Sequence, residues 1–334
     1  MGSSTRSSTI AARDPGGAGF RRTGIDPDRA SLSCPCNTPR VQQSSTHWYG
    51  RWWAILALIV IVIGGTGLLT IKALGLRSVS VDGVPFDQPP TGFDYSWWNA
   101  ALGRWAHPDG VDYDAVRSES IDLRRFIATL GKIGPRSTPQ RFTTEPERLA
   151  YYINAYNALV LFGVVANWPL DTVHEVRGWL DPRPGFGFFY GLRFPLDGGT
   201  TNLYELENEV IRGFGDARIH AAINCASKSC PALMPYAFEP RQLDEQLDAV
   251  TRDFCSRPRH VRIDEEAKEI QLSSIFEWYR SDFEEYARRL GRPATILDFI
   301  LAFAEPQEAA DVERARSAGF EIAFQPYDWT LNRR

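Results

Sequence analysis

One uncharged run of twenty residues limits the structures that this chain can adopt more than any other feature. Residues Trp52–Ile71 read WWAILALIVIVIGGTGLLTI and contain no acidic or basic side chain. At a rise of about 1.5 Å per residue, a helix of this length spans roughly 30 Å, the hydrocarbon thickness of a bilayer. A helix buried in a globular protein would rarely be apolar on every face over this length. The run therefore predicts a transmembrane helix over residues 51–73.

The charges on either side of the run indicate its orientation. The preceding residues hold seven arginines against three aspartates, a balance of +4, whereas the first charges after the run cancel. The positive-inside rule then places the N-terminus in the cytoplasm and the rest of the chain outside, in a single-pass protein of a cell inner membrane or plasma membrane. A cleaved signal peptide would normally have a shorter apolar core, and Ala73-Leu74-Gly75 is a poor cleavage site, so an uncleaved anchor is favoured.

The remaining chain divides into three parts by composition. Residues 1–50 are rich in Ser, Arg, Gly, Pro and Thr without apolar periodicity, which predicts a disordered cytoplasmic tail. Residues 74–94 read as a linker, and residues 95–334 are long enough for one large extracytoplasmic domain. The chain is 43% hydrophobic with a net charge of −4, so it can form a substantial core, and its charge gives no reason to expect a nucleic-acid partner.

Periodicity predicts an α+β fold, a mainly helical single domain with small antiparallel hairpins that follows the one transmembrane helix. Residues 144–147, TEPE, form a capping box before a long apolar segment, which predicts a central buried helix. FFYGLRFPL is compatible with a short hairpin, and HVRIDEEAKEIQLSSIF reads as two strands around a polar turn. EIAFQPYDWTLN offers a last strand that would return to these hairpins.

Three polar residues interrupt apolar faces and are candidate site residues. Asn154 and Asn157 share one face of the predicted central helix, where they would either tie neighbouring loops together or line a site. Glu207 stands in the middle of an apolar stripe in TNLYELENEVIRG. A carboxylate there is costly unless it is paired, so Glu207 is either a member of a structural ion pair or a site residue.

The stretch RIHAAINCASKSCP concentrates residues that can carry chemistry. His220 and Cys225 lie five residues apart, which directs them to different faces of a strand or helix, whereas Cys230 follows a turn and can fold back. Ser229 would cap a helix that starts at Cys230-Pro231, and a helix N-terminus lowers the pKa of a thiol.

Five separated motifs resemble, in order, those of the domain of unknown function 547 family. They are YYINAYNAL, NLYELENEVIRG, RIHAAINCASKSCPAL, LSSIFEWYRSDF and YDWTLN, and the resemblance extends over about residues 95–334. The family implies no established activity. The positions that match its motifs are Asn154, Tyr156, Asn157, Glu207, Arg212, His220, Cys225, Cys230, Pro231, Trp278, Asp282 and Phe283.

These residues support three hypotheses for the cluster. The first is a cysteine peptidase-like or amidase-like hydrolase or transferase that acts on an amide or ester in a bacterial cell envelope, such as a peptide or protein substrate, and needs no cofactor. In it Cys230 is the nucleophile, His220 its base, Glu207 or Asn154 the group that orients the imidazole, and Asn157 or a main-chain N–H the oxyanion donor.

The second hypothesis is a non-catalytic envelope binding or scaffold module, in which Cys225 and Cys230 form a disulfide that stabilises the turn. The third is a zinc site made by His220, Cys225 and Cys230, although this spacing is not a usual zinc pattern and a fourth ligand is missing.

Overall fold

A computed structural model of the chain describes residues 60, 77–79, 81, 83–178 and 181–334. These residues all belong to one compact unit, Ala57–Arg334. The predicted cytoplasmic tail and, apart from residue 60, the predicted transmembrane helix over residues 51–73 lie outside the described residues. The mixture of many helices with small sheets confirms the α+β prediction.

The central element of the fold is helix α5 (Glu145–Ala166), which begins as the sequence predicts. Thr144 accepts a hydrogen bond from Glu147 N, Glu147 accepts one from Thr144 N at 2.8 Å, and Pro146 occupies the first turn. Every residue from 149 to 164 is buried. This helix is long and apolar enough to cross a membrane, but 89% of its apolar window is buried inside the protein, as expected of a core helix.

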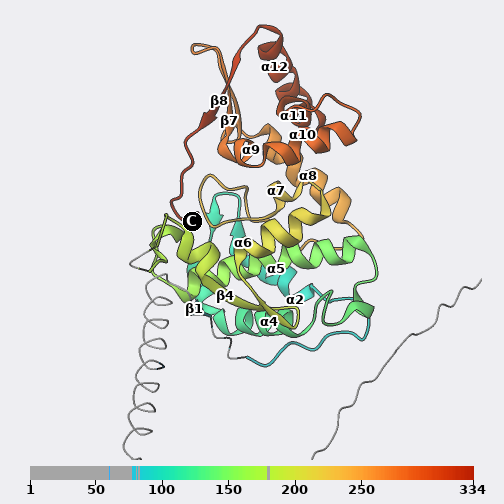
Figure 1. Ribbon diagram of the computed structural model, residues 1–334, viewed down its shortest axis with the longest axis vertical. Coiled ribbons are helices and arrows are strands. Elements are labelled where there is room, and N and C mark those ends of the chain that lie inside the picture. Colours follow the sequence, from blue (N-terminus) through green and yellow to red (C-terminus); the bar gives the residue numbers. More distant parts are fainter. Residues whose placement is uncertain (1–59, 61–76, 80, 82, 179–180) are drawn as a thin grey trace, which may run out of the picture. The chain divides into compact units, whose positions relative to one another are not determined.

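Helices lie around α5 (Figure 1), and buried aromatic side chains pack between them. Trp98 of α2 stacks on Phe126 of α4 with ring centroids 5.1 Å apart, and both side chains are fully buried. Each buried side chain of this size contributes roughly 1.5–3 kcal/mol relative to its exposed state. The helices in this part are α2 (Ser96–Trp105), α3 (Tyr113–Ser118), α4 (Ser120–Lys132), η1 (Pro139–Arg141) and η2 (Val173–Glu175).

Three small sheets accompany the helices. β2 pairs with β3, β4 with β5 and β6 with β7 as antiparallel hairpins, as predicted, but β1 joins β4 and β8 joins β7 in parallel. The strands are β1 (Arg77–Ser78), β2 (Ala106–His107), β3 (Gly110–Val111), β4 (Leu192–Leu196), β5 (Gly199–Thr201), β6 (Val261–Asp264), β7 (Glu269–Ser273) and β8 (Glu321–Gln325). The hairpin predicted for residues 188–196 was wrong in its first half, because Gly187–Gly191 form the π-helical turn η3.

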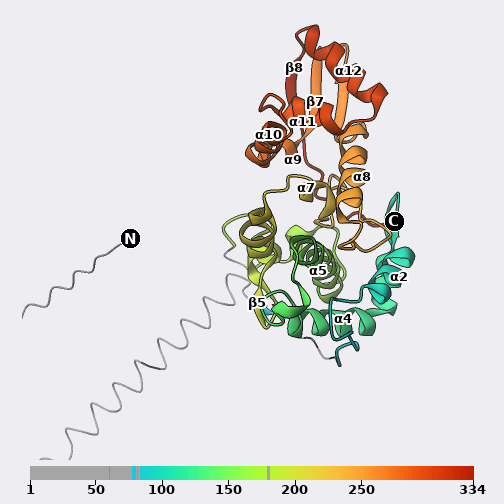
Figure 2. The ribbon, with the colours of Figure 1, turned by 90° about the vertical axis from the view of Figure 1, so that its right-hand side faces the viewer.

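The second half of the domain places β6–β8 beside a group of helices (Figure 1). Helix α8 (Leu243–Ser256) leads to this group from the part that contains α5, and it contacts both α7 and α11 (Figure 2). The other helices of the group are α9 (Ser274–Trp278), α10 (Arg280–Arg289), α11 (Ile296–Phe303) and α12 (Pro306–Ser317). β8 runs parallel to β7 because the crossover through these helices separates them in the chain.

After β8 the chain returns to the α5 part. We call residues 327–332 the strap. Lys228 N donates to Thr330 O at 2.9 Å and Asn332 N donates to Ala226 O at 3.0 Å, so the strap lies along the loop that carries both predicted site cysteines. The predicted last strand is therefore present as β8, and the residues after it pair with the cysteine loop rather than with a hairpin.

Candidate active site

A cavity of about 500 Å³ collects side chains from six separate segments of the chain. Four of the six candidate catalytic residues line it, namely Glu207, His220, Cys225 and Cys230. Asn154 and Asn157 do not line it. Its volume lies within the ordinary range for a small-molecule site.

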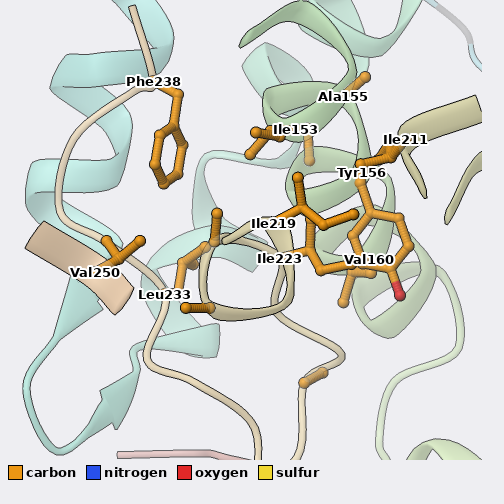
Figure 3. Packing of buried hydrophobic residues seen from close by; sticks show 14 of the residues in the cluster. Ile153, Ala155, Tyr156, Val160, Ile211, Ile219, Ile223, Leu233, Phe238 and Val250 are labelled. Atoms are coloured by element: carbon orange, nitrogen blue, oxygen red, sulfur yellow. The ribbon is translucent and has the colours of Figure 1, made fainter. Parts of the chain in front are cut away.

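Helix α7 (Ile219–Ala222) positions His220 and the first cysteine. Figure 3 shows Ile219 and Ile223 packed among buried side chains, with Tyr156 and Val160 of α5 close by. These apolar contacts fix the short helix against the core. His220 follows Ile219 in the helix and is directed to a different side, toward α10, where it contacts Asp282.

Asn157 holds the end of α7 in place. Its Nδ2 donates to Ala222 O at 3.0 Å, and its Oδ1 accepts from Asn224 N at 2.8 Å. The Asn157 side chain thus binds main-chain groups on both sides of Ile223. The structure therefore does not bring Asn157 into the cavity as an oxyanion donor; it supports the loop that carries Cys225.

Asn154 belongs to a separate structural network. Its Oδ1 accepts from Trp98 Nε1 at 3.2 Å and from Phe238 N at 3.0 Å, and its Nδ2 donates to Ala150 O and Phe238 O. All of its hydrogen-bonding capacity is satisfied far from the imidazole. The expectation that Asn154 orients His220 is not met by these contacts.

Asp282 of α10 orients the imidazole instead. His220 Nε2 lies 2.9 Å from Asp282 Oδ2, and the ring stacks on Tyr279 with centroids 3.9 Å apart. Arg212 of η5 (Arg212–Phe214) donates to both oxygens of Asp282, at 2.7 and 2.8 Å. Burial opposes ionisation of Asp282, but the hydrogen bonds from Arg212 and His220 outweigh it and hold the pKa of this carboxyl well below its ordinary value.

Glu207 lies in a π-helical turn, η4 (Leu206–Ile211), that continues the short helix α6 (Leu203–Glu205). Such turns often occur at functional sites because the extra residue changes where side chains point. Glu207 accepts hydrogen bonds from Tyr156 OH at 3.0 Å and from Tyr279 OH. Both carboxylate oxygens are therefore used by tyrosines, and Glu207 supports the ring of Tyr279 rather than the imidazole directly.

Cys225 faces two hydroxyl groups. Its Sγ lies 3.1 Å from Ser227 Oγ and 3.1 Å from Tyr327 OH of the strap, and Ser227 Oγ lies 2.9 Å from Tyr327 OH. Burial alone would raise the pKa of this thiol, but hydrogen bonds from Cys230, Ser227 and Tyr327 together lower it below its ordinary value.

Cys230 lies behind Cys225 and is buried. Its Sγ accepts a hydrogen bond from Cys225 N at 3.0 Å. Burial raises its pKa well above the ordinary value, and the neighbouring Cys225 raises it further. The predicted helix at Cys230-Pro231 was wrong, since the residues from 223 to 242 contain no helix, and the thiol therefore gains nothing from a helix N-terminus.

The described residues give no support to the disulfide hypothesis or to the zinc hypothesis. Cys225 and Cys230 are free thiols. No group of three or more His, Cys, Asp or Glu side chains among the described residues is arranged to hold a metal ion. His220 is bound to Asp282, and it forms no hydrogen bond with either sulfur although all three line the same cavity.

Three functional positions were missed by reasoning from spacing: Tyr279, Asp282 and Tyr327. Asp282 and Tyr279 come from segments that follow a hairpin, and Tyr327 lies 102 residues after Cys225. The signal available in the sequence was the family motif, because LSSIFEWYRSDF contains the first two and YDWTLN begins with the third.

Comparison with known proteins agrees with the resemblance over part of the chain. Residues 139–255 match the family model described as "Protein of unknown function, DUF547". This segment includes α5, η4, α7 and both cysteines of the cavity. No curated protein and no solved structure gives a significant match to the chain.

Proposed function

We propose that this chain, a member of the DUF547 family over residues 139–255, is a thiol hydrolase or transferase that cleaves an amide or ester bond. One observation carries the proposal. Cys225, with two hydroxyl groups beside its sulfur, lines the same cavity as His220, and His220 is oriented by Asp282. A nucleophile, a base and a group that orients the base are the parts that such catalysis needs. We propose Cys225 as the nucleophile in place of Cys230, because two hydroxyl groups lie beside the Cys225 sulfur whereas Cys230 is buried.

The reaction uses each of these groups in turn. Cys225 gives its proton to His220, directly or through one water, and its sulfur attacks the carbonyl carbon of the substrate. The C–N or C–O bond then breaks, and the leaving group takes the proton from His220. Water or a second nucleophile attacks the resulting thioester, gives its proton to His220, and the thiol is regenerated when it receives that proton.

Tyr327 and Ser227 make this step easier because the Tyr327 hydroxyl can donate to the thiolate while Ser227 Oγ donates to Tyr327 OH. A hydrogen bond to a charged group stabilises it by about 1.5–3 kcal/mol. Asp282 in turn stabilises the imidazolium that forms at His220, and Arg212 holds Asp282 in its charged form. Tyr279, stacked on the imidazole, fixes the plane of the ring.

The proposed location of the reaction rests on the uncharged run. We propose that residues 51–73 anchor the protein in the membrane with the domain outside the cytoplasm, so that its substrate is an amide or ester of the cell envelope. The support is the length of the run and the excess of arginine before it.

The experiment that tests the proposal is alkylation of the full chain in detergent with iodoacetamide, with mass spectrometry to locate the label. We expect Cys225 to react much faster than free cysteine near neutral pH, and Cys230 and Cys255 to react slowly because both are buried. A Cys225 that reacts no faster than free cysteine would contradict the proposal, and a native chain without a free thiol at residues 225 and 230 would favour the non-catalytic module.

A further inference from the structure

One positively charged side chain that lines the cavity, Arg183, forms no ion pair with a carboxylate of the described residues. Arg183 lines the cavity from the loop before η3, and its side chain is exposed. Its Nη2 donates to Tyr190 OH, and its guanidinium lies over the Tyr190 ring, 5.0 Å from the centroid. The aromatic ring thus holds the guanidinium in place while most of its N–H groups remain available for an anion.

The other charged groups of the cavity already have partners. Arg212 binds Asp282 through two hydrogen bonds, and both oxygens of Glu207 accept from tyrosines. An anionic group that enters the cavity therefore meets an uncompensated positive charge at Arg183. Because a guanidinium binds a carboxylate through two parallel hydrogen bonds, a carboxylate is the group that fits this position.

Exposed aromatic rings line the cavity on two segments far apart in the sequence. Tyr204 is 38% exposed and stacks on Tyr190, with centroids 4.3 Å apart. Trp278 is 47% exposed and stacks on Trp329 of the strap, with an interplanar angle of 19°. Flat aromatic faces that line a cavity can stack on flat or cyclic groups of a ligand.

We infer that the substrate is an anionic acyl compound, an amide or ester whose acyl part carries a flat or cyclic group and a carboxylate. The carboxylate binds Arg183, the ring lies against the aromatic side chains, and the carbonyl reaches Cys225. This inference rests on the proposed function, since it names the substrate of the same thiol. A cavity of about 500 Å³ has room for a ligand of this kind.

A matched pair of alkylating reagents tests the inference without knowledge of the natural substrate. 4-(Iodoacetamido)benzoate and 4-(iodoacetamido)benzamide share the reactive group, the amide and the ring, and they differ in one negative charge. In both, the Cys225 sulfur displaces iodide and the thiol proton is lost. We expect the benzoate to alkylate Cys225 of the full chain about tenfold faster than the benzamide, the effect of one hydrogen bond to a charged group.

Substitutions locate the source of that preference. Arg183→Met should bring the ratio of the two rates close to one, and Arg183→Lys should retain part of it, since lysine keeps the charge without the bidentate geometry. Within each protein, the ratio cancels any change in thiol reactivity. Arg252→Met is the matched control, an exposed arginine paired with Glu305 away from the cavity, and should leave the ratio unchanged.

The outcomes separate the inference from the function on which it rests. If both reagents label Cys225 rapidly but at equal rates, or if the preference survives Arg183→Met, the anionic substrate class is wrong and the thiol enzyme stands. If neither reagent labels Cys225 faster than free cysteine, both the proposed function and this inference are overturned.

Discussion

Two clusters of buried polar groups differ in whether all of their hydrogen-bonding atoms have partners. The first is centred on Asn154 and Asn157. Each hydrogen bond of these two side-chain amides is made with a main-chain group or with Trp98. The second is centred on His220 and Cys225 and lines a cavity. In the second cluster, Nδ1 of His220 makes no hydrogen bond with a described residue, and the partners of the Cys225 sulfur are hydroxyls that can turn.

The difference teaches which property marks a site in this protein. Both clusters contain polar side chains that would be costly to bury alone, and both are hydrogen-bonded as that cost requires. The amide cluster stabilises one arrangement of the chain. The cavity cluster places the Cys225 sulfur, whose pKa is lowered, in the lining of the same cavity as His220.

The largest effect that would distinguish the clusters is expected at Cys225. Cys225→Ser should lower the rate of alkylation in the cavity by more than about a hundredfold, because a hydroxyl is not ionised near neutral pH. Cys230→Ser should stay within about threefold of the wild type, since a serine oxygen can still accept from Cys225 N–H. The measurement is the rate of iodoacetamide labelling by mass spectrometry. Rapid labelling of Cys230 in Cys225→Ser would return the role of nucleophile to Cys230.

The next largest effect is expected in stability, at Asn154. Asn154→Leu should destabilise the protein by about 2–4 kcal/mol, because it leaves Trp98 Nε1 and two backbone groups of Phe238 buried without partners. Glu207→Gln keeps the shape of the side chain and should cost less than about 1 kcal/mol. Urea unfolding of the full chain in detergent, followed by tryptophan fluorescence, measures both. Equal losses of unfolding free energy in the two variants would mean that the two clusters do not differ in their contribution to stability.

A smaller effect, on rate rather than stability, is expected at Asp282. Asp282→Asn should slow alkylation of Cys225 at pH 7 by about tenfold, because the imidazolium loses its charged partner. Glu285→Gln, a change at a half-buried residue on the same helix α10 that does not line the cavity, is the matched control and should leave the rate unchanged. An unchanged rate in Asp282→Asn would mean that the pair of His220 and Asp282 is structural.

The smallest effect is expected in the pH dependence, at Tyr327. The thiolate is the reactive form, so the alkylation rate rises as pH passes upward through the pKa of Cys225, which lies below the ordinary value. Tyr327→Phe removes one hydroxyl that favours the thiolate, so this pKa should rise and the midpoint should move to higher pH by about one unit. Tyr236→Phe is the control, because this tyrosine does not line the cavity. A midpoint that moves to lower pH would contradict the assigned role of Tyr327.

Much of the fold could be predicted because its signals are local. The capping box before α5, the apolar run that follows and the hairpin of β6 and β7 each depend on residues close together in the chain. The parallel pairing of β8 with β7 could not be predicted in this way, since it depends on how α9–α12 fold back. The π-helical turns were also missed, because an extra residue per turn leaves no clear mark in an apolar pattern.

The site could be predicted only as far as its residue types. Glu207 was recognised as a carboxylate in an apolar stripe, and His220 and Cys225 as members of a cluster that can carry chemistry. The structure places all three around one cavity. The spacing of the residues could not decide whether Cys225 or Cys230 is the better candidate nucleophile. That choice depends on Tyr327, which lies 102 residues after Cys225. The partner of His220 was misassigned for the same reason, since Asp282 lies 62 residues beyond it.

Because Tyr327 lies in the strap, the acidity of the Cys225 thiol depends on when the strap is synthesised. Tyr327 is synthesised 102 residues after Cys225, and until it arrives the sulfur lacks one of the hydroxyls that favour its thiolate. At about 5–20 residues per second, this interval lasts roughly 5–20 seconds. A growing chain would thus carry a thiol of more ordinary acidity while it is still unfolded and exposed, and its reactivity would appear only once the domain has closed around it.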